Sequence, residues 1–149
     1  MDATTEISSR RIDGLLNHYA QSHRHPTNEG IHFAAIPLIM LSLIGLMFCL
    51  HPLVAYGFIL ASMVYYLRLS LVFTAAMSVW SAIMLAVVHA MGEQRMYICL
   101  AIFISAWVMQ FIGHKIEGKK PSFFEDVQYL WIGPLFVLQP LMRKFRIAW

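Results

Sequence analysis

The sequence predicts an all-α, polytopic membrane protein with about four transmembrane helices, and three observations support this fold class. Hydrophobic residues make up 59% of the 149 residues and charged residues only 13%, whereas about a quarter of the residues in a soluble domain are charged. The mean hydropathy is +0.63. The apolar residues are grouped in runs that approach the roughly 20 residues needed to span a bilayer. We expect residues 1–149 to form a single integral membrane domain.

Four apolar runs are the candidate membrane helices. They are Ile31–Leu50, Leu53–Leu67, Leu71–Met91 and Met96–Gly113. The second run is short, about 22 Å of helix at 1.5 Å per residue, and aromatic and basic residues at its end can extend it by interfacial anchoring. Because the links after the first and third runs are tight, the runs are expected to pair as two helical hairpins.

Two further segments flank these hairpins. Arg10–Ser22 is typical of a short N-terminal amphipathic helix on the membrane surface. Val127–Met142 is apolar but interrupted by Gly133-Pro134 and by Pro140, so it predicts a C-terminal re-entrant or interfacial helical segment.

The distribution of basic residues predicts the orientation. Lys and Arg flank the N-terminal side of the first run and follow the second and fourth runs, whereas the opposite side would hold only Arg95. Cytoplasmic loops are enriched in Lys and Arg, so four crossings with a cytoplasmic N-terminus are expected. Since the basic residues lie beside apolar runs, the net charge of +3 indicates contact with membrane lipid headgroups rather than with nucleic acid.

Two polar clusters would then lie at the same cytoplasmic face, residues His18–His32 and residues His114–Lys120. Five of the seven histidines fall in them, namely His18, His23, His25, His32 and His114. Imidazole suits iron, zinc, copper or nickel, and two or three histidines with Glu117 would resemble the facial arrangement of non-haem iron(II) oxygenases. Spacing alone fits equally well a set of interfacial imidazoles that contact lipid phosphates, because no HxxxH or HExxH box is present.

The remaining polar residues leave several roles open. Glu117 could bind a metal, orient a ligand histidine or pair with Lys120. Lys119 and Lys120 could hold a carboxylate headgroup or extend towards the interface. His51 is expected in a solvated turn on the far side, and His89 at a wet interface, with a lesser claim to a metal. Cys49 and Cys99 lie in apolar stretches and are expected to be buried free thiols.

Two motifs enclose the apolar hairpins. They are Tyr19-x-x-x-His23-x-x-x-x-Asn28-x-x-x-His32-x-x-x-x-Pro37 and Gln110-Phe111-Ile112-Gly113-His114-x-x-Glu117-x-x-x-Pro121. With both motifs, nearly the whole chain resembles a family of small membrane proteins whose characterised fungal member is an Fe(II)-dependent 2-hydroxy fatty acid dioxygenase. The segment 117–126 resembles the bacterial branch of that family, which favours a bacterial inner membrane over the endoplasmic reticulum.

The resemblance implies a cytoplasm-facing Fe²⁺ site that uses O₂ to convert a long-chain 2-hydroxy fatty acid to a fatty acid one carbon shorter. His23, His32 and His114 match the family's histidine positions and are the expected metal ligands, and Glu117 matches its carboxylate as a fourth catalytic residue. Within this hypothesis Asn28, Lys119 and Lys120 bind the substrate. His18, His25 and His89 are lower-ranked candidates for metal binding or for support of the ligands.

Two other functions fit the same residues. A non-enzymatic lipid-binding or scaffolding protein would use the histidines and lysines to hold anionic headgroups. A zinc-dependent lipid hydrolase would keep the metal site and replace iron with Zn²⁺, although the chain has no G-x-S-x-G motif of a serine esterase. The sequence does not indicate an oligomeric state.

Overall fold

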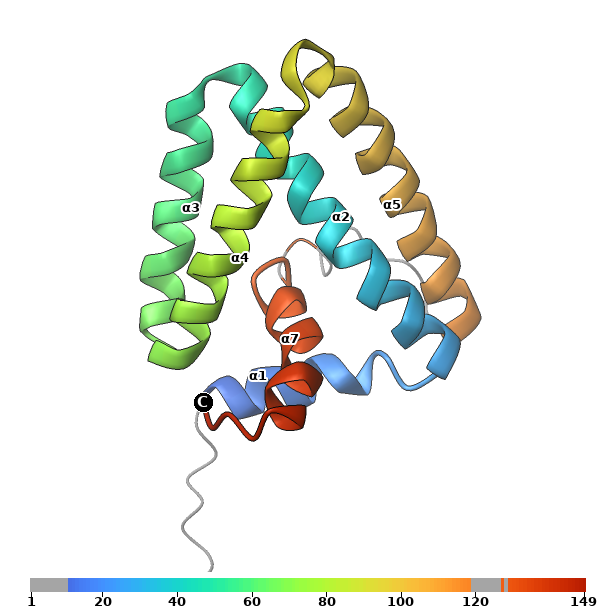
Figure 1. The fold of residues 1–149 in the computed structure, drawn as a ribbon. Helices are drawn as coiled ribbons and strands as arrows, with labels where there is room; N and C mark the ends of the chain where they lie inside the picture. Colours follow the sequence, from blue (N-terminus) through green and yellow to red (C-terminus); the bar gives the residue numbers. More distant parts are fainter. Residues whose placement is uncertain (1–10, 119–126, 128) are drawn as a thin grey trace, which may run out of the picture.

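The computed structural model describes residues 11–118, 127 and 129–149, and the regular secondary structure of these residues is entirely helical (Figure 1). The elements are α1 (Arg11–Gln21), α2 (Pro26–Leu50), α3 (Pro52–Leu67), α4 (Leu71–Ala90), the 3₁₀ turn η1 (Gly92–Gln94), α5 (Arg95–Glu117) and α7 (Ile132–Lys144). The all-α prediction is therefore confirmed for the described residues.

Helix α2 begins at Pro26, five residues before the expected start of the first apolar run at Ile31. Proline is well suited to the first position of a helix, because its fixed φ angle is helical and its missing N–H would have no intrahelical partner there. His25 precedes it as the N-cap, and its Nδ1 accepts a hydrogen bond from the Thr27 N–H at 3.2 Å. The histidine-rich segment before the first membrane helix is thus partly helical itself.

Among the described residues, three helical segments are long and apolar enough to cross a membrane. They are α2, α4 and the continuous stretch Gly92–Glu117 formed by η1 and α5. Helix α3 is apolar but has only 16 residues, which corresponds to about 24 Å. The three long candidate spans agree with the sequence prediction, and a fourth crossing by α3 remains a prediction.

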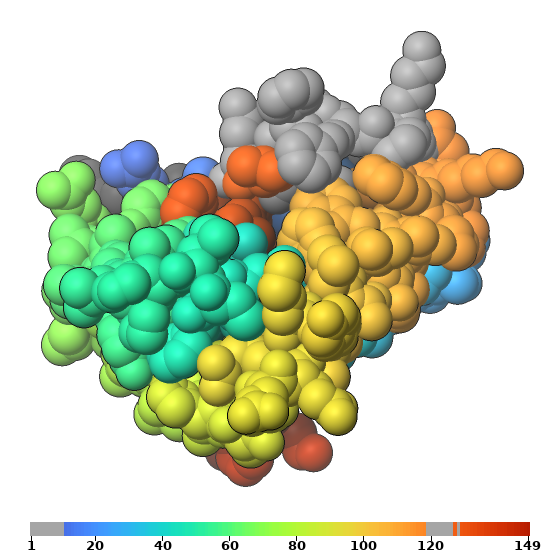
Figure 2. All heavy atoms as spheres, turned by 90° about the horizontal axis from the view of Figure 1, so that it is seen from above, coloured from blue at the N-terminus to red at the C-terminus, as the bar shows by residue number. Residues whose placement is uncertain are grey.

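Helices α2 to α5 form two pairs that meet at one end and separate towards the other. In Figure 1 the antiparallel helices α2 and α5 lie on one side and the α3–α4 hairpin on the other. The α2–α3 and α4–α5 links lie at the closed end, and the view onto this end shows α3 and α5 on opposite sides (Figure 2). At Gly45 a methyl group would overlap the Cys99 Sγ atom, so small residues allow α2 and α5 to approach closely.

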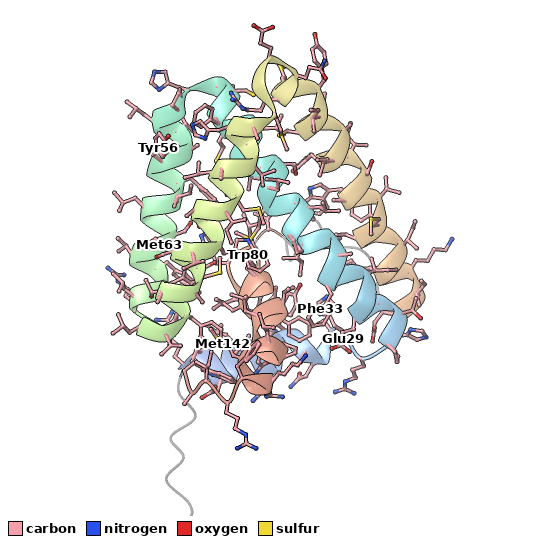
Figure 3. The ribbon with its side chains drawn as sticks, in the orientation of Figure 1. Glu29, Phe33, Tyr56, Met63, Trp80 and Met142 are labelled. Atoms are coloured by element: carbon pink, nitrogen blue, oxygen red, sulfur yellow. The ribbon has the colours of Figure 1, made fainter. Side chains whose placement is uncertain are left out.

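Helices α1 and α7 occupy the open end between the two pairs. The apolar face of α1, formed by Ile12, Leu16 and Tyr19, is buried in a cluster that includes residues of α7, α3 and α4. Figure 3 labels Met63, Trp80 and Met142, which belong to or pack against this cluster. The predicted amphipathic N-terminal helix is confirmed, and its apolar face contacts protein.

Helix α7 forms the C-terminal part of the stretch expected at Val127–Met142. Its Gly133-Pro134 pair lies in the first turn, where proline is tolerated. With 13 residues, α7 is too short to cross a bilayer alone, since a crossing takes about 20. Tyr66 Oη donates to the Trp131 carbonyl at 2.9 Å, and Trp131 Nε1 donates to Ser62 Oγ at 2.9 Å, so α3 holds the residue before α7. A re-entrant or interfacial position for α7 remains a prediction.

The outward faces of α3, α4 and α5 carry exposed apolar side chains, including Leu60, Val79, Ile83, Leu100 and Ile104. In water such a surface would be unfavourable, so it indicates contact with lipid.

Cys99 is buried as expected, but Cys49 is exposed, which corrects the expectation of two buried thiols.

Candidate metal centre

Three histidines from distant parts of the chain meet at the open end of the α2–α5 pair. His23 lies in the link between α1 and α2, His32 in the second turn of α2, and His114 in the last turn of α5. Their side chains are 5%, 0% and 7% exposed, although histidine is a polar residue that is seldom fully buried. One potential ligand nitrogen of each ring lies within 4.8 Å of those of the other two.

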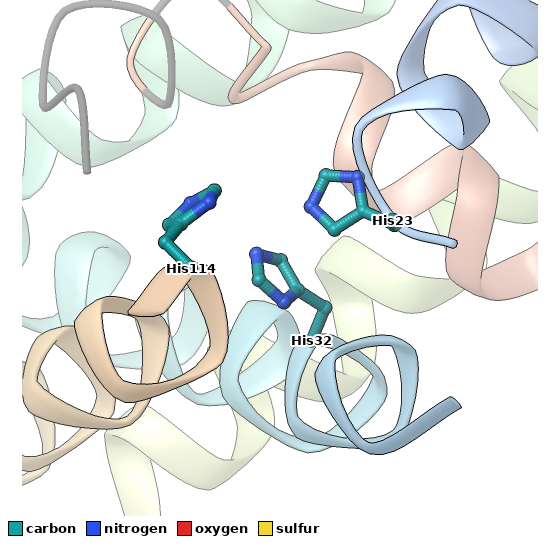
Figure 4. Close-up of side chains that lie close together, drawn as sticks. All are labelled: His23, His32 and His114. Atoms are coloured by element: carbon teal, nitrogen blue, oxygen red, sulfur yellow. The ribbon is translucent and has the colours of Figure 1, made fainter. Parts of the chain in front are cut away.

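The three rings lie around a common space (Figure 4). The ring centroids are 4.1 Å apart for His23 and His32, 5.0 Å for His32 and His114, and 5.9 Å for His23 and His114. The first two pairs meet at 72° and 84°. The rings are therefore edge to face and do not form a stack.

Backbone carbonyls fix the tautomers of two of these rings. His23 Nδ1 donates to the Tyr19 carbonyl at 2.8 Å, and His32 Nδ1 donates to the Asn28 carbonyl at 2.9 Å. A carbonyl can only accept, so the proton of each ring is on Nδ1, and Nε2 carries the lone pair. A backbone carbonyl that holds the second nitrogen of a ligand histidine is common in metal sites, where it orients the ring and raises its basicity.

Tyr19 supports His23 through its side chain as well. Its ring stacks on the imidazole at a centroid distance of 4.3 Å and an interplanar angle of 17°. The Tyr19 ring also packs against the Phe136 ring of α7, with 5.1 Å between the ring centroids. The position of His23 therefore depends on α1 and α7, although neither helix supplies one of the three histidines.

Glu117 lies at the end of α5 but is not one of the side chains grouped around the common space. Its Oε1 accepts the Arg24 N–H at 3.0 Å, and its Oε2 accepts the His25 N–H at 2.8 Å and Asn28 Nδ2 at 3.0 Å. Three N–H donors stabilise the ionised carboxylate. Of the roles considered for Glu117, this geometry favours positioning: it joins the end of α5 to the segment that carries His23.

Asn28, expected to bind substrate, is fully buried between α2 and α5. Its Nδ2 is bonded to Glu117, and its Oδ1 lies so close to Gly113 that a methyl group there would overlap it. The same methyl carbon would lie 3.3 Å from His32 Cε1. Gly113 therefore brings α5 close enough for His114 to reach the other two histidines, and Asn28 contributes to this contact.

The other site candidates lie elsewhere. His18 is exposed and its ring lies 5.7 Å from that of Tyr129. His25 is exposed and caps α2, and His89 is exposed at the opposite end of the molecule, where its Nδ1 donates to the Leu85 carbonyl at 2.7 Å. None of these three belongs to the histidine group. Lys119 and Lys120 lie outside the described residues.

The three nitrogens suit a transition metal. Neutral imidazoles are good ligands for iron and zinc and poor ones for calcium or magnesium. Zinc–nitrogen bonds are about 2.0–2.1 Å long, so two nitrogens on one ion lie no more than about 4.2 Å apart. The three nitrogens here lie within 4.8 Å of one another, so the rings would close inward to share an ion. Three protein ligands would leave further positions for oxygen ligands.

Sequence reasoning did not assign roles to Tyr19 and Gly113, although both stand in the motifs.

A family model described as "2-hydroxy-palmitic acid dioxygenase Mpo1-like" matches residues 10–145. The chain belongs to the Mpo1-like family. The matched region contains all three histidines and both ends of the α2–α5 pair, so the expected family is confirmed. Among curated proteins and among solved structures, no match was found.

Proposed function

We propose that this Mpo1-like protein is an Fe²⁺-dependent dioxygenase that uses O₂ to shorten long-chain 2-hydroxy fatty acids by one carbon. The observation that carries the proposal is the group of three buried histidines, whose ligand atoms lie within 4.8 Å of one another. Burying three imidazoles has a desolvation cost, which a bound cation would offset. The family description names the substrate class.

Each part of the site has a role in this proposal. His23, His32 and His114 hold the ion, and Fe²⁺ when bound supplies Lewis acidity and the capacity to react with O₂. The Tyr19 and Asn28 carbonyls keep two rings in the required tautomer. Glu117 holds the His23 segment against α5. Lys119 and Lys120, which follow directly in the sequence, are proposed to neutralise the substrate carboxylate.

The surrounding helices account for a lipid substrate. Their apolar outer faces keep the protein in the bilayer, where long-chain fatty acids are concentrated. Each CH₂ group buried on binding contributes about 0.8 kcal/mol, so a long-chain acid binds far better than lactate. We propose the cytoplasmic face for the site because the basic residues lie on that side of the predicted topology. The resemblance of residues 117–126 to the bacterial branch of the family favours a bacterial inner membrane.

The proposal is tested with protein purified anaerobically in detergent. We expect about one equivalent of iron and an Fe²⁺-dependent loss of 2-hydroxypalmitate with uptake of O₂. His32→Ala should remove both, because His32 is fully buried within the histidine group. His18→Ala is the matched control, since His18 is exposed on α1.

The alternatives give different results. A zinc-dependent hydrolase would retain zinc and act on esters without O₂ uptake. A lipid-binding protein would contain no stoichiometric metal and would lose lipid gradually with each histidine or lysine removed. Full activity of His32→Ala would rule out the proposed ligand set.

A further inference from the structure

A cavity of about 30 Å³ lies near the histidine group, between α2, α5 and residues 129–133. Three of its lining residues lie four positions from a histidine of the group; two of these pairs share a face of α2 or α5, and in the third the two rings stack. These pairs are Tyr19 with His23, Ile36 with His32, and Gln110 with His114. Since Ile36 follows His32 along α2 and Gln110 precedes His114 along α5, the cavity lies about one turn deeper in the α2–α5 pair than the three rings.

Gln110 gives this cavity an unsatisfied polar group. Its side chain is 5% exposed, and its Oε1 is buried without a hydrogen-bond partner among the described residues. Buried amide oxygens are almost always bonded, so this one indicates a ligand that donates a hydrogen bond. A volume of about 30 Å³ exceeds what one water-sized group requires.

The rest of the lining distinguishes between possible donors. Ile36, Ile39 and Leu130 form apolar walls beside the polar Gln110 side chain, and the aromatic residues Tyr19, Tyr129 and Trp107 complete most of the lining. The polar groups of this lining would also suit a water molecule, but the apolar walls fit a carbon that bears a hydroxyl group better than a water alone. Leu130 also lines a second cavity, of about 20 Å³, whose other walls are mainly apolar residues of α2, α3 and α4. An alkyl chain attached to the hydroxyl-bearing carbon would therefore extend past Leu130 towards this second, apolar cavity.

We infer that Gln110 is the residue that recognises the substrate's hydroxyl group: its Oε1 accepts a hydrogen bond from the 2-hydroxyl of a 2-hydroxy fatty acid. The inference rests on the proposed function, because that function names the substrate. It concerns binding and not oxidation, so it predicts discrimination between 2-hydroxypalmitate and palmitate even where no turnover occurs.

The test compares the binding of these two acids to wild type and to Gln110→Leu. Binding is measured by calorimetry in detergent under nitrogen with the full-length, iron-loaded protein. Wild type should prefer the hydroxylated acid by roughly 10-fold to 100-fold, as expected for a buried hydrogen bond. Gln110→Leu should bind both acids alike, with its palmitate affinity within about twofold of wild type.

A preference retained in Gln110→Leu would overturn the inference. Equal weakening of both acids, with the preference retained, would do the same and would show that Gln110 holds a buried water or supports the helix. Because Oε1 has no partner, Gln110→Leu should melt at the wild-type temperature or above it. Gln110→Asn keeps the amide but withdraws it by one methylene, so it should show an intermediate preference.

The outcomes also separate this inference from the proposed function. Discrimination that depends on Gln110, without O₂ uptake by wild type, would support recognition of the hydroxyl group and contradict the dioxygenase. Turnover of 2-hydroxypalmitate with discrimination that is independent of Gln110 would support the dioxygenase and overturn this inference alone.

Discussion

The two ends of the α2–α5 pair both carry histidines, but only one end brings them together. At the open end His23, His32 and His114 are buried within reach of one another. At the closed end His51 and His89 are exposed. The His89 ring packs against the Phe48 ring, with 4.8 Å between the ring centroids, and His51 is the N-cap of α3. The grouping of histidines therefore depends on the close contact between α2 and α5 at the open end and not on the number of histidines nearby.

A hydrogen bond from Nδ1 to a backbone carbonyl is not sufficient to bring a histidine into the group. His89 donates from Nδ1 to the carbonyl four residues earlier, as His23 and His32 do. All three rings thus have Nε2 as the acceptor nitrogen. What His89 lacks is burial in the contact between α2 and α5, where Gly113 and Asn28 bring the two helices together at the open end.

The largest expected effect separates the two ends directly. His114→Ala removes one of three ligand nitrogens and should abolish stoichiometric metal binding, whereas His89→Ala should leave the metal content unchanged. Elemental analysis of the two purified variants measures this contrast. Equal metal content in both variants would show that the open end is not the metal site.

The second prediction compares the glycines of the two ends. Gly113→Ala places a methyl group against Asn28 and His32, so metal affinity should fall by about tenfold or more. Gly45→Ala meets only the short Cys99 side chain and Val88, so it should change thermal stability and leave metal affinity as in wild type. Competition with a chelator and thermal unfolding measure the two quantities.

A suitable control for both substitutions is Gly57→Ala on α3, where an added methyl group would meet no atom within 4 Å. It should match wild type in metal affinity. A Gly113→Ala protein that also matched wild type would show that the close contact between α5 and Asn28 does not position His114.

The smallest expected effect concerns Glu117. Glu117→Ala removes the acceptor of three hydrogen bonds that connect α5 to the His23 segment. Metal affinity should fall by about tenfold, in the lower part of the range for groups that support ligands, because all three histidines are retained and only the positioning of the His23 segment is weakened. Glu93→Ala, at the closed end, serves as the control. An affinity loss as complete as that of His114→Ala would instead assign Glu117 to the ligands.

Much of this arrangement followed from the sequence. Apolar runs of about helix length gave the membrane helices, and the two polar clusters at their ends were expected at one face. The structure brings His23, His32 and His114 together as the motifs predicted. The assignment of these residues as metal ligands is still a prediction.

Other features could not be derived from the sequence, for physical reasons. Helix α2 begins at Pro26, before the apolar run, because proline breaks a helix in its interior but suits the first position. His18, His23 and His25 all lie in the same polar cluster of the sequence. Only His23 is buried beside His32 and His114, whereas His18 and His25 are exposed. The role of Glu117 depends on backbone N–H groups about 90 residues earlier, which no local pattern reveals.

The histidine group draws on both the first and the last of the long apolar helices of the described chain, α2 and α5. During synthesis, His23 and His32 are therefore made long before His114, and two residues alone do not complete the group. A cation that needs all three histidines would be captured only after α5 has returned to lie beside α2. Because a ligand that binds only the assembled state stabilises it, the ion would favour the finished bundle and would leave earlier, partly inserted forms unaffected.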